Sequence, residues 1–396
     1  MTKLLPFEEA QRQLIALAQP LEADTRSPVH AVGRYLAEPM VAQRTQPAAD
    51  LSAMDGYAIS GEGPWRLTGE SRAGNPFEGA LADGDAVRIS TGALMPSGSD
   101  RVLIQENAEI DGDVLTATGG IPTAGRHVRR KGFDFNRADK LLDAGVYFGP
   151  AQLALALAAN TASLKAHRKP RIAIIDSGDE LSAAPDMSSP HQIPASNGSM
   201  IAAMVRDLTS DIMHIGPIPD RLDALEQAFN EAGKADVIVT SGGASVGDHD
   251  LIRPALEAWG ANIAFWRIAI RPGKPLLVAQ RGEQIILGLP GNPVSSFVTA
   301  QFFLLPLLRA LAGASRPFAQ AVGAALSGSL MSGGPRLHFV RAVYDQGRVT
   351  PIDEQDSSAL GALSLANALI ERPVDCPTSA SGDEVQVYLL ENGRIA

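Results

Sequence analysis

The chain has 396 residues, enough for two to four domains that each enclose a hydrophobic core. Its formal net charge of −10 counts against nucleic acid and anionic membranes as partners. The single cysteine, Cys376, excludes an intrachain disulfide and a cysteine metal cluster. The N-terminus lacks the apolar core of a signal peptide, and apolar runs such as 153–159 are shorter than the roughly 20 residues of a membrane span, so we expect a cytoplasmic protein.

The N-terminal part predicts a helical domain that is interrupted by a small β domain. Apolar spacing predicts a helix over residues 5–18, and Gly149-Pro150 opens an alanine- and leucine-rich helix over 150–160. Short β-like runs such as GYAIS and DAVRIS, separated by turn signals, lie between them. We expect the two helices to pack together in one discontinuous helical domain, 1–54 and 139–168, with an inserted β domain at 55–138.

The rest of the chain predicts an α/β domain followed by a second small β domain. Strand-like runs, including RIAIID, DIMHIG, DVIVT, IAFWRIAI (263–270) and QIILG, alternate with helical patterns over 169–313. Such alternation is typical of a doubly wound, mostly parallel sheet with helices on both faces. Residues 314–396 contain LHFVRAVY and EVQVYLL and predict a small β-barrel-like domain. The expected fold class is therefore multidomain α/β plus β.

Two glycine-rich loops of the α/β domain predict an anion site. TSGGASVGDHD (240–250) and LPGNPVSSF (289–297) each lie between a strand pattern and a helix pattern. Unpaired N–H groups and the positive end of a helix converge at such loops. RPGKP (271–275) adds two cations, which matter because the whole chain is negative. We expect a ligand that carries phosphates or another oxyanion.

Acidic residues near these loops predict a divalent cation, although simpler interpretations stay open. Asp248 and Asp250 end the first glycine loop, and DSGDEL (176–181) follows the first strand of the α/β domain. Carboxylate oxygens at such turns hold Mg²⁺. An ordinary helix N-cap is the simpler interpretation of Asp250, although three glycines and two acids in one loop favour function, and DSGDEL could equally be a solvated acidic turn. No Walker loop, GxGxxG fingerprint or GxSxG elbow occurs in the sequence.

Seven motifs occur along the chain in a fixed order and spacing: SAMDGYA, RISTGALMPSG, RKGFD, SGDEL, TSGGASVGDHD, RPGKP and LPGNPVSS. This order and spacing resembles that of the molybdopterin molybdenumtransferase (MoeA) family, whose animal relative is the gephyrin E-domain. The resemblance covers nearly the whole chain and implies that the α/β domain binds molybdopterin. It implies that adenylyl-molybdopterin is hydrolysed with Mg²⁺, that molybdate is inserted and that AMP is released. It also implies a homodimer with a shared active cleft, and a transient contact with molybdopterin adenylyltransferase.

Matched motif by motif, the resemblance implies three sets of site residues. The catalytic acids are Asp55, Asp134, Glu180, Asp220 and Asp250. The metal ligands are Glu180, Asp248 and Asp250. The substrate-binding residues are Thr91, Ser241, Gly242, Gly243, Ser245, Gly247, Arg271, Lys274, Pro290, Gly291, Asn292, Pro293 and a serine at 357 or 358, written here as Ser357.

This chain departs from the family pattern, and two other functions stay open. Asp176-Ser177 stands where a Ser-Thr pair is more typical, and Phe133 replaces an acid. One alternative is the adenylyltransferase, which uses the same α/β domain but needs neither the N-terminal 168 residues nor the C-terminal domain. The other is a non-catalytic pterin-binding scaffold, against which the retained acids count.

Overall fold

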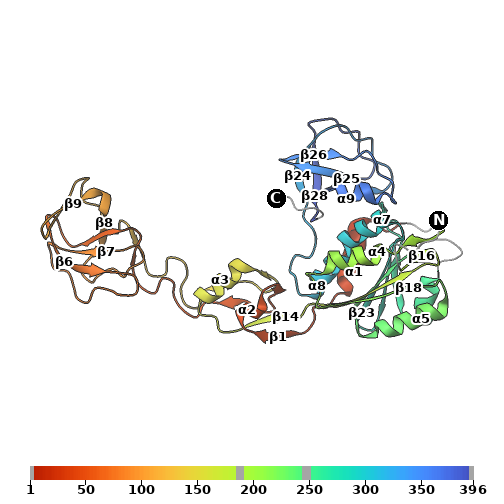
Figure 1. Ribbon diagram of the computed structural model, residues 1–396, viewed down its shortest axis with the longest axis horizontal. Helices are drawn as coiled ribbons and strands as arrows, with labels where there is room; N and C mark the ends of the chain where they lie inside the picture. Colours follow the sequence, from red (N-terminus) through yellow and green to blue (C-terminus); the bar gives the residue numbers. More distant parts are fainter. Residues whose placement is uncertain (1–3, 184–190, 243–250, 392–396) are drawn as a thin grey trace.

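The computed structural model describes residues 4–183, 191–242 and 251–391. The molecule is elongated, with the inserted β domain at one end and the α/β domain at the other (Figure 1). A small middle domain lies between them, and the C-terminal barrel stands beside the α/β domain (Figure 1).

The inserted β domain is one six-stranded sheet in the order β8-β5-β7-β6-β10-β9. Its elements are β5 (Gly56–Ile59), β6 (Trp65–Ser71), β7 (Asp85–Ile89), β8 (Arg101–Ile104), η1 (Gln105–Asn107), β9 (Ala108–Asp111) and β10 (Val114–Ala117). Ile59, Trp65 and Leu115 fill the core on one face, and Ile89 and Val102 on the other. The predicted β insertion is confirmed.

The middle domain is discontinuous, as predicted, but strands rather than long helices hold it together. Four antiparallel pairs, β1–β14, β2–β13, β3–β12 and β4–β11, join the incoming chain to the outgoing chain. Its elements are β1 (Ala23–Arg26), α2 (Pro28–Ala31), β2 (Arg34–Tyr35), β3 (Met40–Val41), β4 (Leu51–Ser52), β11 (Val128–Arg129), β12 (Lys140–Leu142), β13 (Tyr147–Phe148), α3 (Pro150–Ala158) and β14 (Leu164–His167).

The N-terminal helix α1 (Phe7–Leu17) does not pack with α3, so that expectation was wrong. Its buried residues, including Phe7 and Leu14, belong to the core of the α/β domain. The Phe7 ring meets Phe302 edge-on, with 5.6 Å between ring centroids. The apolar stripe of an amphipathic helix settles where most apolar surface can be buried, and the α/β domain offers more of it than the small α3.

The α/β domain is doubly wound around a six-stranded sheet in the order β18-β15-β19-β23-β22-β20, which confirms the prediction. The first four strands are parallel, β22 pairs antiparallel with β23, and β20 pairs antiparallel with β22. The strands are β15 (Arg171–Ser177), β18 (Asp211–Ile218), β19 (Val237–Ser241), β20 (Asn262–Trp266), β22 (Leu277–Arg281) and β23 (Gln284–Leu289), with a separate short pair β16 (Leu181–Ser182) and β17 (Ile193–Pro194).

Helices cover both faces of this sheet. One face packs against α1, α4 (Asn197–Val205), α7 (Pro293–Thr299), η4 (Ala300–Leu304) and α8 (Leu305–Leu311). The other packs against α5 (Leu222–Glu231), η3 (Ala232–Lys234) and α6 (Ile252–Ala258). The continuous stretch Pro293–Leu311 is long and apolar enough to cross a membrane, longer than the runs noted in the sequence, but 83% of its most apolar 18-residue part is buried inside the protein.

Residues 263–270 do not form the single strand that was predicted. Strand β20 ends at Trp266, Arg267 has a φ of 67°, and β21 (Ile270–Arg271) then pairs with β25 (Leu337–Asp345) of the C-terminal domain. A non-glycine residue with positive φ turns the chain sharply out of the strand. The RPGKP segment is thereby carried to the C-terminal domain.

The C-terminal domain is a small closed barrel, which confirms the barrel-like prediction. Its order is β25-β26-β24-β28-β27, and β27 pairs again with β25 to close it. Besides β25 its elements are β24 (Val322–Leu326), β26 (Arg348–Pro351), α9 (Leu360–Leu365), β27 (Ala368–Arg372) and β28 (Glu384–Leu389). Phe339 of β25 stacks on Phe302 with ring centroids 4.1 Å apart, so the barrel shares the core of the α/β domain.

Candidate active site

A cavity of about 730 Å³ lies at the carboxyl ends of the parallel strands. Ser177 at the end of β15, Ser241 at the end of β19 and Pro290 just after β23 line it. The first strand, β15, has the second strand, β18, on one side and the third, β19, on the other. Ligands of open α/β sheets bind at such a switch in strand order.

The LPGNP loop forms one wall of this cavity. Pro290, Gly291, Asn292 and Pro293 all line it, and Asn292 precedes the first turn of α7 in extended backbone geometry. Asn197, the first residue of α4, donates from Nδ2 to the Gly291 carbonyl at 2.6 Å. Two helix N-termini therefore meet at the cavity, which favours a negatively charged ligand.

The TSGG loop enters the cavity from β19 and is described only up to Gly242. Gly242 has a φ of 99°, and a Cβ atom there would lie 2.7 Å from the Ser177 carbonyl oxygen, so the position requires glycine. Ser241 and Gly242 line the cavity as predicted. The remaining predicted residues of this loop lie outside the described residues: Gly243, Ser245, Gly247, Asp248 and Asp250.

The predicted acids Glu180 and Asp220 lie at the same strand ends. Glu180 lines the cavity directly. Asp220 is connected to it through Ser177, whose hydroxyl donates to Asp220 Oδ1 at 2.7 Å. The Asp220 backbone N–H donates in turn to Asp179 Oδ1 at 3.2 Å. In the part of the chain that the structure describes, no three acidic, histidine or cysteine side chains are grouped as a metal site.

Sequence reasoning placed Asp176 in an acidic turn, but its buried pairing with a histidine was missed. Asp176 lines the cavity, is 1% exposed, and lies with Oδ2 2.7 Å from His214 Nε2. His214 is on β18, which pairs in parallel with β15. The two residues come together only because these strands are neighbours in the sheet, and no local sequence pattern predicts their contact.

A second cavity of about 490 Å³ adjoins the first, sharing Pro275 and Ser295 with it. The predicted residues Arg271, Lys274 and Ser357 line it. Cationic side chains that line one cavity suit a negatively charged oxyanion.

Arg336 and His338 also line the second cavity and were missed in the sequence. Burial, together with the charges of Arg271 and Arg336, lowers the pKa of His338 to about 4, so its ring is neutral near pH 7. Strand β25 carries His338, and its parallel pairing with β21 places this residue opposite Arg271. These partners are more than 60 residues apart in the chain, and nothing in either segment predicts the pairing.

The two serines left open in the sequence serve different cavities. Ser357 lines the second cavity and accepts a hydrogen bond of 2.8 Å from Asn292 Nδ2 at its hydroxyl. Its carbonyl accepts another, of 3.1 Å, from the Val294 backbone N–H. Ser358 lines the first cavity. The segment 356–359 thus connects the two cavities.

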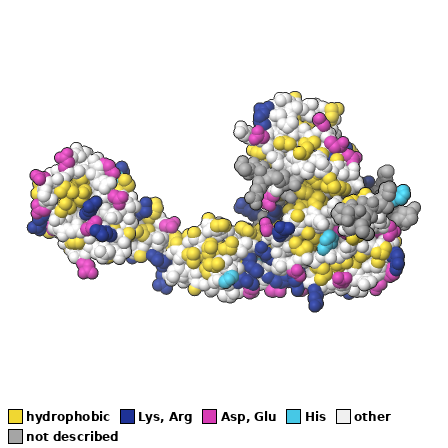
Figure 2. Space-filling view, viewed as in Figure 1, with side chains coloured by type: hydrophobic (Ala, Val, Ile, Leu, Met, Phe, Trp, Pro, Cys, Tyr) yellow, Lys and Arg dark blue, Asp and Glu magenta, His cyan; other side chains and the backbone are white. Residues whose placement is uncertain are grey.

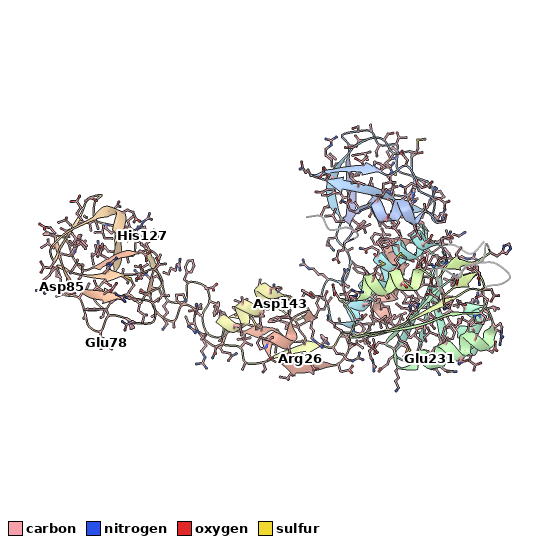
Figure 3. The ribbon with its side chains drawn as sticks, in the orientation of Figure 1. Arg26, Glu78, Asp85, His127, Asp143 and Glu231 are labelled. Carbon is pink, nitrogen blue, oxygen red and sulfur yellow. The ribbon has the colours of Figure 1, made fainter. Side chains whose placement is uncertain are left out.

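The predicted residues of the N-terminal part are not brought to these cavities. Asp55 lines a hollow of about 200 Å³ in the inserted β domain and accepts a 2.7 Å hydrogen bond from the Thr91 backbone N–H. Asp134 is exposed in a turn between β11 and β12. Figure 3 shows how far apart the regions are, with Asp85 of β7 and Glu231 of α5 near opposite ends of the molecule.

Comparison with known protein families gives the same order of domains along the chain as the structure. Residues 5–160 match the MoeA N-terminal region (domain I and II), 173–310 match a probable molybdopterin binding domain, and 323–390 match the MoeA C-terminal region (domain IV). The molybdopterin molybdenumtransferase of Haemophilus influenzae is 31% identical over 97% of this chain and 98% of its own length. That of Bacillus subtilis is 32% identical over 98% and 95%.

Solved structures agree with this relationship. A molybdopterin biosynthesis moeA protein from Pyrococcus horikoshii OT3 superimposes with a TM-score of 0.84 at 26% identity, covering 98% of this chain and 100% of that one. Matching models cover most of the chain, and full-length relatives exceed 30% identity. The chain therefore belongs to the molybdopterin molybdenumtransferase (MoeA) family, a family of transferases of molybdenum cofactor biosynthesis.

Proposed function

We propose that this protein inserts molybdate into adenylyl-molybdopterin and releases AMP, forming molybdenum cofactor. The observation that carries the proposal is the pair of adjoining cavities. Two helix N-termini lie at the larger cavity, and Arg271, Lys274 and Arg336 line the other. A substrate with a pyrophosphate and a separate oxyanion needs two neighbouring anion sites of this kind. The names of the full-length relatives support the same reaction.

In this proposal the first cavity holds the pterin, the pyrophosphate and the nucleotide. Hydrolysis of a pyrophosphate depends mainly on positioning and on neutralising charge. The N-terminal turn of α4 and Ser295 in the first turn of α7 supply backbone N–H groups for this purpose. Ser177 and Asp220, joined by their hydrogen bond, orient groups at the end of β15.

The second cavity holds molybdate, a dianion. Arg271, Arg336 and Lys274 neutralise its charge, and Ser357 donates from its hydroxyl. Because His338 is neutral near pH 7, it adds no charge there, but its ring N–H can still donate a hydrogen bond to the anion. The shared residues Pro275 and Ser295 bring the molybdate next to the substrate.

Mg²⁺ is proposed as the cofactor, since oxygen donors at the cavity suit its chemistry. Of its implied ligands, Glu180 lines the cavity and presents an exposed carboxylate, whereas Asp248 and Asp250 lie outside the described residues. When bound, Mg²⁺ would neutralise charge on the pyrophosphate oxygens.

A homodimer with a shared cleft is part of the proposal, because Asp55, Thr91 and Asp134 are remote from the cavities of their own chain. A second copy can present these residues if the N-terminal domains reach across. Exposed apolar side chains of the middle domain, Val29 at 61% and Leu157 at 59%, offer a contact surface. Figure 2 shows apolar side chains gathered over this part of the molecule. Delivery of substrate would involve transient contact with molybdopterin adenylyltransferase in the cytoplasm.

The test is a reaction of the purified full chain with adenylyl-molybdopterin, molybdate and Mg²⁺, followed by mass spectrometry of the bound product. We expect molybdenum cofactor and one AMP per product, both dependent on molybdate and Mg²⁺. Binding of the substrate without release of AMP would instead identify a scaffold. Adenylylation of molybdopterin at the expense of ATP would identify an adenylyltransferase.

A further inference from the structure

A buried carboxylate at the wall of the larger cavity has one oxygen without a hydrogen-bond partner. Asp176 is 1% exposed, and His214 Nε2 engages its Oδ2 at 2.7 Å. Its Oδ1 is also buried and has no partner among the described residues. A buried carboxylate oxygen without a donor is costly, and such oxygens are almost always satisfied. The missing donor therefore points to a ligand of the cavity.

Asp176 lies where a ligand of the cavity can be reached. Asp176 pairs in register with Ser241 of β19, so it lies at the switch point of the sheet, where ligands of this fold bind. Above it the first turn of α4 packs tightly. A Cβ atom on Gly198 would lie 2.2 Å from Asp176 Oδ2 and 2.4 Å from His214 Nε2. Since Oδ2 is enclosed by α4 and His214, Oδ1 is the oxygen left for a ligand in the cavity.

The surroundings indicate what kind of donor fits. A phosphate would be repelled by the Asp176 carboxylate, so phosphates belong at the helix N-termini instead. Apolar side chains line other parts of the same cavity, including Leu181, Ile193 and Leu360. A flat heteroaromatic ring satisfies both features, because its faces lie against apolar walls while an N–H on its edge donates to a carboxylate.

On the basis of the proposed function, we propose that Asp176 accepts a hydrogen bond from the exocyclic amino group of a heteroaromatic ring of the substrate. His214 is a positioning residue, which holds the carboxylate beneath α4. Adenylyl-molybdopterin carries two rings with exocyclic amino donors, the pterin and the adenine. The hydrogen-bond chemistry is the same for both, and the experiment distinguishes them.

The first test changes the ligand and leaves the protein intact. Binding of pterin and of AMP to the wild-type full chain is compared with binding of their counterparts whose exocyclic amino group is dimethylated. We expect dimethylation of the ring that contacts Asp176 to weaken binding about ten- to a hundredfold, as for loss of a hydrogen bond to a charged group. A loss with pterin assigns the pterin, and a loss with AMP assigns the adenine. Equal affinities for both pairs would overturn the proposal.

The second test changes the protein. In Asp176→Ser the shorter side chain no longer reaches the ring, so we expect dimethylation to have little further effect on affinity. A full effect of dimethylation in this variant would mean that steric bulk is responsible, and would overturn the proposal. Asp223→Asn, which alters an exposed acid of the same domain paired with Arg221, is the matched control and should bind like wild type.

His214→Gln tests the positioning role separately. We expect the Michaelis constant for adenylyl-molybdopterin to rise several-fold while turnover at saturation changes little. Loss of turnover at an unchanged Michaelis constant would contradict the positioning role. A wild-type chain that binds neither pterin nor AMP would refute the proposed function and this inference with it. Binding that is equal in wild type and Asp176→Ser would refute this inference alone.

Discussion

The side-chain amide of Asn292 donates a hydrogen bond of 2.8 Å to the hydroxyl of Ser357. Asn292 belongs to the LPGNP loop of the α/β domain, and Ser357 to the segment between β26 and α9 of the C-terminal barrel. The contact lies where the first cavity meets the second, since Asn292 lines one and Ser357 the other. The position of the LPGNP loop thus depends on the barrel.

Ser357→Ala should weaken molybdate binding about ten- to a hundredfold. The change removes a hydroxyl donor from the second cavity and also the acceptor of Asn292, and a hydrogen bond to a charged group contributes about 1.5–3 kcal/mol. Isothermal titration with molybdate measures the effect. Ser364→Ala is the control, because Ser364 is exposed on α9 and bonds to the Gly361 carbonyl of its own helix. Equal affinities in the two variants would remove Ser357 from the anion site.

Arg341→Met should destabilise the barrel by roughly 2–4 kcal/mol, since three backbone carbonyls would lose a charged donor. Arg341 is 1% exposed and donates to the carbonyls of Glu354, Asp356 and Ala359. These residues flank Ser357, so molybdate affinity should fall as well. Urea unfolding monitored in the barrel measures the first effect. Arg348→Met, in which an exposed arginine is lost, should change neither stability nor affinity appreciably.

Lys274→Met should weaken anion binding in the second cavity about ten- to a hundredfold, because a charge-assisted hydrogen bond is lost while the alkyl stem remains. Molybdate affinity of the wild type should fall as salt is added, and more steeply than that of the variant. The control is Lys234→Met, since Lys234 lies in η3, just before β19, and therefore at the opposite end of the strands from the cavities. Identical salt dependence in wild type and Lys274→Met would place Lys274 in the solvent.

Co-expression of an Asp55→Ala chain with a Glu180→Gln chain should restore part of the activity that each loses alone. If the cleft is shared, a heterodimer contains one cleft in which both acids are intact. AMP release by purified heterodimers, isolated through two different tags, measures the recovery. Activity no higher than that of either mutant homodimer would argue that each chain uses its own acids.

The folded protein should lose stability as the pH falls from about 6.5 to about 4, in part through His338. The pKa of His338 is lowered to about 4, chiefly by burial, so in this window the unfolded chain binds a proton that the folded chain does not. The linkage then makes stability rise with pH across the window, by about 2–3 kcal/mol in total, and the loss levels off below pH 4. Urea unfolding as a function of pH measures it. In His338→Gln this part of the pH dependence should be absent.

Much of the fold and part of the site follow from patterns that are local in the chain. A strand, a glycine turn and a helix start occupy consecutive residues around LPGNP, so the sequence is enough to place Pro290, Gly291, Asn292 and Pro293 in a loop at a strand end, where they line the first cavity. The doubly wound domain follows in the same way from alternating strand and helix patterns. Local hydrogen bonding and side-chain periodicity determine these elements.

Tertiary structure alone decided which surfaces meet. Periodicity shows that one face of α1 is buried, but not that Phe7 packs on Phe302 instead of on α3. The register of β15 with β18 places His214 opposite Ile174, within reach of the Asp176 side chain, and that of β21 with β25 places His338 opposite Arg271. These contacts join segments tens of residues apart, and they form because burying the shared apolar core fixes the strand order and register. The sequence by itself determined most helices and strands and the residue types of the loops. Packing decided how these loops come together around two cavities.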